Sequence, residues 1–154
     1  MPQTPTDTWQ AEIRAELANL EEIGLATKPE PGDLPNLRGV EVHGVSMPLV
    51  RAIGGDHVIY LDFKQRYDLE RRLREAEAAG RTEVVAGLRK CRQRAGVLVA
   101  DVSGHKVTDA LVAAMLHQAF LLGAYYELDL FGEITTRLFE HINQRFYKST
   151  TLNK

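Results

Sequence analysis

The fold of this chain is constrained most by two short apolar runs that are separated by a long helical pattern. The runs are 57–63 (HVIYLDF) and 96–100 (GVLVA), and both are bounded by turn-forming residues, which is typical of buried strands. Residues 66–94 between them are rich in Arg, Glu, Leu and Ala, and Gly80 divides this stretch into two predicted helices. The two strands are therefore expected to be separated by a helical insert.

The remaining sequence predicts three more helices and one more strand. An apolar stripe at helical spacing runs through 8–23, and a Pro- and Gly-rich linker at 24–39 ends that helix. Valines alternate with polar residues within 40–45, which predicts a partly exposed strand. Two long helices are expected at about 107–126 and 130–147. This order of elements predicts an α+β fold in which an antiparallel sheet packs against helices.

The composition is that of an ordinary globular protein, with 44% hydrophobic and 26% charged residues. A formal net charge of −2 argues against general nucleic-acid binding, which favours a basic surface. The single cysteine, Cys91, cannot form an internal disulfide, which fits a reducing compartment. The first residues lack a signal-peptide pattern, and no apolar run approaches the roughly 20 residues of a membrane span. A cytoplasmic protein without a membrane partner is expected.

Two acidic turns are the candidates for chemistry. Asp56 follows two glycines at the start of one predicted strand, and Asp101 follows the other predicted strand. Carboxylates beside glycine turns suit hard divalent cations such as Mg²⁺ and Mn²⁺, which prefer oxygen ligands. Two carboxylates from neighbouring strands could hold a metal pair about 3.5–4 Å apart, the spacing that serves phosphoryl chemistry. The alternative is that each aspartate is only a turn residue or a helix cap.

Taken in order, the motifs resemble the opening of a known phosphatase family. The chain has Leu-Pro at 34–35, a predicted strand, GGD at 54–56, a second strand, DVSGH at 101–105 and an Ala-Leu pair at 110–111. This series resembles the SpoIIE/RsbU branch of the PPM-type (type 2C-like) metal-dependent serine/threonine phosphatases. The resemblance implies the N-terminal half of an αββα sandwich.

The resemblance also implies a domain organisation. Residues 1–38 would be an N-terminal helix and linker, and residues 39–154 would be the N-terminal portion of the phosphatase domain, with a helical insert at about 64–95. The helix at 8–23 resembles the segment that joins such domains to an upstream sensor. The implied substrate is a phosphorylated regulatory protein, for example an anti-sigma-factor antagonist.

By the same resemblance, Asp101 would bridge two Mn²⁺ or Mg²⁺ ions, Asp56 would bind one of them, and the carbonyl of Val102 would complete the set. A water acidified by both metals would attack the phosphorus of a phosphoserine or phosphothreonine, so no catalytic side-chain nucleophile is expected. His105, at a predicted helix start, could bind phosphate because helix N-termini favour anions, or it could only cap the helix.

The sequence departs from the family pattern in ways that bear on activity. The family draws further metal aspartates from the later half of its domain, whereas this chain offers only Asp109 and Asp129 after Asp101. Residues 1–154 alone are therefore expected to be incomplete and weakly active or inactive. The alternative function is a phosphatase-like signalling or protein-interaction module without catalysis.

Two features suggest protein contacts. The helix at 8–23 carries an apolar stripe that should not stand alone in water, so it should pack on a partner copy or on its own domain, and the prediction is a homodimer through this helix. The members of the stripe are Trp9, Ile13, Leu17, Leu20 and Ile23. Residues 64–94 hold ten Lys or Arg and five Asp or Glu, which indicates either a docking arm for an acidic partner or a solvated helical hairpin held by ion pairs.

Overall fold

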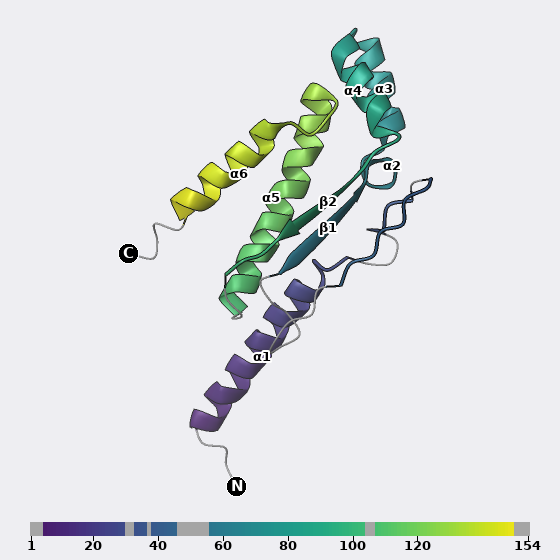
Figure 1. The fold of residues 1–154 in the computed structure, drawn as a ribbon. Helices are drawn as coiled ribbons and strands as arrows, with labels where there is room; N and C mark the ends of the chain where they lie inside the picture. The colour runs from purple at the N-terminus through teal and green to yellow at the C-terminus, as the bar shows by residue number, and fades with distance from the viewer. Residues whose placement is uncertain (1–4, 30–32, 37, 46–55, 104–106, 150–154) are drawn as a thin grey trace.

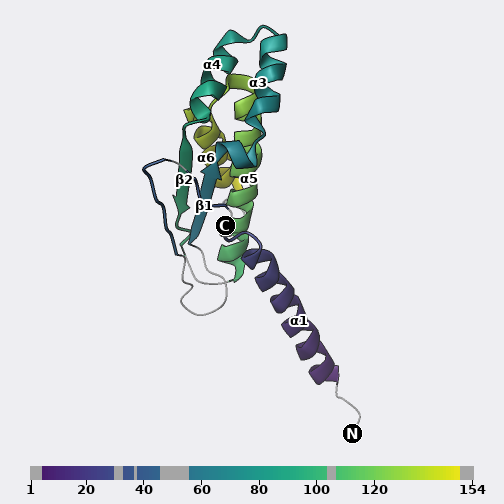
Figure 2. The same ribbon diagram turned by 90° about the vertical axis from the view of Figure 1, so that its right-hand side faces the viewer.

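The computed structural model describes residues 5–29, 33–36, 38–45, 56–103 and 107–149. These residues form helices and a small sheet, which confirms the α+β class (Figure 1). The elements in chain order are α1 (Pro5–Leu25), β1 (His57–Asp62), α2 (Phe63–Arg66), α3 (Leu69–Ala78), α4 (Thr82–Cys91), β2 (Ala95–Ala100), α5 (Val107–Phe131) and α6 (Thr136–Ser149). The predicted insert is the hairpin of α3 and α4, which stands at one end of the sheet (Figure 2).

The sheet consists of β1 and β2 paired antiparallel, with a register that runs from His57 opposite Ala100 to Asp62 opposite Ala95. Side chains alternate between the two faces of a strand. Ile59 and Leu61 of β1 belong to the buried core on the face covered by α5, and Leu98 of β2 packs against that core. The opposite face is more open, because Val97 and Val99 are exposed there.

Helix α5 is the centre of the packing. Phe120, Ala124 and Leu128 on its inner side are buried in the same core as Ile59 and Leu61. Helix α6 packs closely on α5 because Gly123 has no side chain: a Cβ atom there would lie 2.1 Å from Cδ1 of Leu138.

By length and composition, residues Thr108–Phe131 of α5 could also cross a membrane. Core helices of globular proteins have the same length and composition, and α5 places its inner side chains in the core, with 28% of this window buried.

A buried arginine ties the α3/α4 hairpin to α5. The Nε of Arg72 donates a hydrogen bond to the carbonyl oxygen of Tyr67 over 2.9 Å, and its guanidinium forms an ion pair with Asp129. The same group lies 4.1 Å from the ring centroid of Tyr125, in cation–π geometry. The Arg72 side chain is almost fully buried, and these contacts replace part of the water that its charge would otherwise require, while its buried Nη2 has no hydrogen-bond partner among the described residues.

The structure corrects two of the predicted elements. Residues 41–45 do not form a strand, and only Val40 makes an isolated bridge. Gly44 lies against the hydroxyl of Tyr60, so this segment crosses the open face of the sheet instead of pairing along an edge. The first of the two long helices continues to Phe131 and ends at Gly132, so the second begins only at Thr136.

Two glycines with left-handed backbone angles differ only in their surroundings, which makes them a matched pair for mutation. Gly80 has a φ of +67° with open space around it, whereas Gly132 has a φ of +74° and a Cβ there would lie 2.2 Å from the carbonyl oxygen of Val84. We expect Gly80→Ala to lower the free energy of unfolding by about 1 kcal/mol, from backbone strain alone. Gly132→Ala should cost about 3 kcal/mol, because a clash with backbone is added.

Urea denaturation followed by far-ultraviolet circular dichroism measures both losses. Equal losses for the two variants would show that α4 does not press against the end of α5.

Candidate functional site

The two predicted metal ligands lie at the same end of the sheet. Asp56 directly precedes β1 and Asp101 directly follows β2. The ladder ends with His57 opposite Ala100, so Asp56 and Asp101 are the residues that flank its last pair. We call these two residues the strand-end acidic pair.

The surroundings of the pair are open to solvent. Asp56 and Asp101 are both exposed, and Val102, whose carbonyl was predicted to be a ligand, is half-buried. His105, the predicted phosphate-binding residue, lies outside the described residues, as do the two glycines before Asp56. The site is therefore defined here by two carboxylates and the backbone that follows the second one.

The oxygen atoms offered by the strand-end acidic pair suit a weakly bound divalent cation. Two carboxylates and a backbone carbonyl are oxygen ligands of the kind that Mg²⁺ and Mn²⁺ take, with waters filling the other positions. Within the described ranges, no group of three or more His, Cys, Asp or Glu side chains is arranged to hold a metal. Asp129 cannot join the pair, because it is bound to Arg72 and lies about 30 Å along α5 from Asp109.

A histidine pair lies beneath the same end of the sheet. His57 Nε2 and His117 Nδ1 are 2.6 Å apart, and the two rings meet edge to face with centroids 4.8 Å apart. His57 is buried on the face that α5 covers, and His117 is half-buried on α5 itself. Sequence reasoning did not predict this contact, since the two residues are 60 positions apart. One indication of it is present in the sequence: by the alternation of a strand, His57 shares a face with the apolar residues Ile59 and Leu61.

Both histidines are held in the neutral form near pH 7. Burial lowers the pKa of His57 below its usual value. Burial, followed by the neighbouring His57 and Arg66, lowers the pKa of His117 to about 4, although Asp33 acts in the opposite direction. Two neutral rings make one hydrogen bond if one nitrogen donates its proton and the other accepts it. The pair therefore joins β1 to α5 directly beside Asp56.

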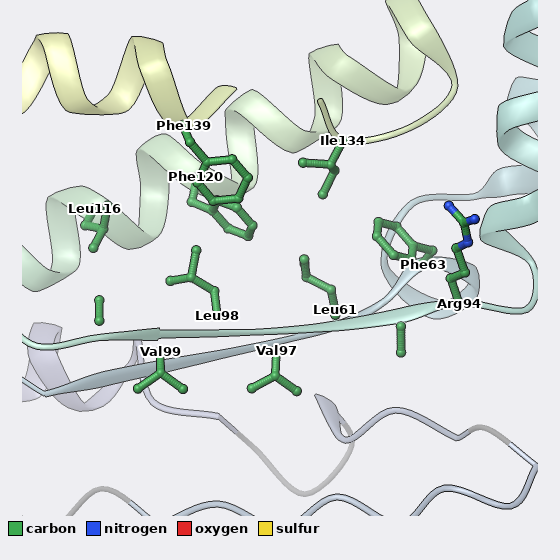
Figure 3. A pocket seen from close by; sticks show the side chains of 13 residues that line it. Leu61, Phe63, Arg94, Val97, Leu98, Val99, Leu116, Phe120, Ile134 and Phe139 are labelled. Atoms are coloured by element: carbon green, nitrogen blue, oxygen red, sulfur yellow. The ribbon is translucent and has the colours of Figure 1, made fainter. Parts of the chain in front are cut away.

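An apolar groove runs along the outer edge of β2, with a volume of about 610 Å³. We call it the β2-edge groove. Figure 3 shows Leu61 and Leu98 pointing toward Phe120 and Phe139, whereas Val97 and Val99 point to the other side of the sheet. Among the described residues that line it, Arg94 is the charged one and none is an acid, base or nucleophile. A strand edge with apolar walls is suited to pairing with a further strand.

A polar hollow lies at the opposite end of β1, and its carboxylates have structural partners. Asp62 accepts hydrogen bonds from the backbone N–H groups of Lys64 and Gln65, which caps α2. Arg66 binds Asp33 over 2.8 Å and so fastens the linker to α2. Both carboxylates of the hollow thus have partners within the chain, and neither needs a ligand to explain its position.

Comparison with known proteins gives no relative to set beside these residues. No family model, curated protein or solved structure matches the chain.

The histidine pair predicts a loss of stability in mild acid. The unfolded chain protonates His117 near pH 6.5, whereas the folded chain does so only near pH 4. Between these values the unfolded state binds more protons, so stability rises with pH and is lost on acidification. We expect the melting temperature to fall between pH 7 and pH 5, and His117→Gln to reduce that fall.

Thermal melts at a series of pH values test this expectation, with His43→Gln as the control because the His43 side chain is 73% exposed and lies outside the contact between β1 and α5. An equal slope in the parent and in His117→Gln would contradict it.

Proposed function

We propose that this chain is the metal-binding front portion of a PPM-type serine/threonine phosphatase domain of the SpoIIE/RsbU kind. The observation that carries the proposal is that Asp56 and Asp101 flank the last pair of the β1/β2 ladder, His57 opposite Ala100. Two aspartates that are 45 positions apart in the sequence therefore lie at the same end of the sheet, which supports a shared divalent cation.

The arrangement around the pair supports the same assignment. The order of a strand, a DVS turn and a long helix is the order that the motifs resemble, and in this chain it is β2, residues 101–103 and α5. Helices α5 and α6 lie over one face of the sheet, as one helical layer of an αββα sandwich would (Figure 1). The β2-edge groove leaves room for the further strands that such a sandwich contains.

The chemistry assigns distinct tasks to the residues of this chain. Asp56 and Asp101 would hold Mn²⁺ or Mg²⁺ together with the carbonyl of Val102. A bound cation supplies an acidified water and neutralises charge on the phosphoryl group. The histidine pair positions the start of β1 against α5 and so holds Asp56 in place. His105 would contact the phosphate, and no side-chain nucleophile takes part.

The proposed substrate is a phosphoserine or phosphothreonine on a cytoplasmic regulatory protein, such as an anti-sigma-factor antagonist. Helix α1 would receive the signal from an upstream sensor. Both assignments follow from the family resemblance, and the exposed position of the acidic pair is compatible with a protein substrate.

A second candidate is a phosphatase-like signalling module without catalysis. It is favoured by the small number of carboxylates near the pair. Asp129 is bound to Arg72, and the described residues hold no cluster of three or more metal-binding side chains. Such a module would keep the fold and use α1 and the α3/α4 hairpin as contact surfaces.

The first test of the proposal is metal binding. Asp101→Asn should weaken Mn²⁺ binding more than Asp56→Asn, because a bridging ligand serves two ions. We expect a loss of at least about tenfold for Asp101→Asn, or about 1.4 kcal/mol, in titration calorimetry. Asp68→Asn is the control, since Asp68 caps α3 far from the pair and asparagine caps equally well. Equal binding by all three variants would exclude the pair as a metal site.

The second test is catalysis. Residues 1–154 alone should barely hydrolyse p-nitrophenyl phosphate or a phosphoserine peptide, because the pair lacks the further aspartates of the family. A longer chain that carries those motifs should gain Mn²⁺-dependent activity, and Asp101→Ala should abolish it. Robust turnover by residues 1–154 would show that the ligands are misassigned. Normal metal binding without activity in the longer chain would favour the signalling module.

A further inference from the structure

Helix α1 projects from the rest of the molecule. Its C-terminal end lies beside the start of α5, and its N-terminal end points away from the sheet in both views (Figures 1 and 2). As a result its apolar stripe is poorly covered: Trp9 is 63% exposed, Ile13 39% and Ile23 53%. A helix with this much apolar surface in water is expected to pack against something.

The charges of α1 indicate what kind of surface it would bind. Between Trp9 and Leu25 the helix has four glutamates and one arginine. Glu12 and Glu16 are one helical turn apart and lie beside Trp9 and Ile13, along one edge of the stripe. The surface that receives this helix should therefore be apolar with a basic margin.

The groove between α5 and α6 has these properties. Its volume is about 390 Å³, and its lining includes Leu122, Tyr126 and Leu130, all exposed apolar residues of α5. A row of basic residues on α6 forms its margin at four-residue intervals, namely Arg137, His141 and Arg145. We call this surface the α5/α6 groove. Glu127 in the lining is buried and accepts a hydrogen bond from the backbone N–H of Thr135, so its charge is directed at the loop before α6.

We propose that α1 of a second copy of this chain lies in the α5/α6 groove, and that the two copies exchange their α1 helices. The stripe would cover Leu122, Tyr126 and Leu130, while Glu12 and Glu16 would face the basic row of α6. Both rows repeat every four residues, about 6 Å along a helix, so their charges can align. This is recognition of an amphipathic helix by a groove.

The geometry favours a second copy over the chain's own α1. The groove lies along the later half of α5, from Ala119 to Phe131, whereas α1 meets α5 at its beginning and points the other way (Figure 1). A reciprocal exchange closes with two-fold symmetry and covers the stripe in both copies. The inference does not depend on the proposed phosphatase function.

Charge reversal and rescue test the exchange. The parent chain should be a dimer by light scattering, and Glu12→Lys with Glu16→Lys should weaken it by at least about tenfold, because both reversed charges meet the basic row. Arg137→Glu with Arg145→Glu should do the same from the other side. All four changes in one chain should restore the dimer. The control is Arg74→Glu with Lys90→Glu, which reverses two exposed charges on the α3/α4 hairpin and should leave the dimer intact.

The single tryptophan reports where α1 lies. In the dimer, acrylamide should quench Trp9 fluorescence poorly, and the charge-reversal variants should become accessible to it. A monomer with accessible Trp9 at every concentration would overturn the proposal. A monomer with protected Trp9 would overturn it in favour of folding back onto the same chain. A dimer that survives both reversals would overturn it in favour of another surface, such as the β2-edge groove.

Discussion

The packing of β1 against α5 is the contact on which the rest of the structure depends. Ile59 and Leu61 enter the core from one face of the strand, and the same phase directs His57 to His117. A slip of one residue would turn all of these side chains to the open face, so the register is strongly specified. This register also puts Asp56 and Asp101 on either side of the last pair of the ladder.

Carboxylates at the two ends of α5 lie in different surroundings. At its beginning lie the exposed carboxylates of the strand-end acidic pair. Near its end Asp129 pairs with the buried Arg72 and helps to fix the α3/α4 hairpin. A carboxylate that balances a buried guanidinium cannot be withdrawn at low cost. Charged groups at the two ends are therefore used differently, although both look alike in the sequence.

Elements with local signals could be predicted from the sequence. The runs that became β1 and β2, and the break at Gly80, depend on periodicity and on one glycine. The segment at 40–45 was predicted wrongly, because alternation does not reveal whether an edge is available for pairing. The contact of His57 with His117 joins residues far apart in the sequence, so no local pattern could show it. The roles of Asp56 and Asp101 as metal ligands stay a prediction, since the ladder shows only that both residues lie at the same end of the sheet.

The α3/α4 hairpin also has a consequence for how the sheet forms. The strands it joins are far apart in sequence, with Asp62 and Ala95 at the two ends of the connection. Once the hairpin has folded, α3 and α4 lie side by side. The end of α4 is then close to the start of α3, and so to the end of β1. The entropy of closing the loop then corresponds to a few flexible residues instead of some thirty, which reduces the cost by about 1–2 kcal/mol. If the hairpin forms first, the pairing of β1 with β2 therefore has a smaller entropic cost.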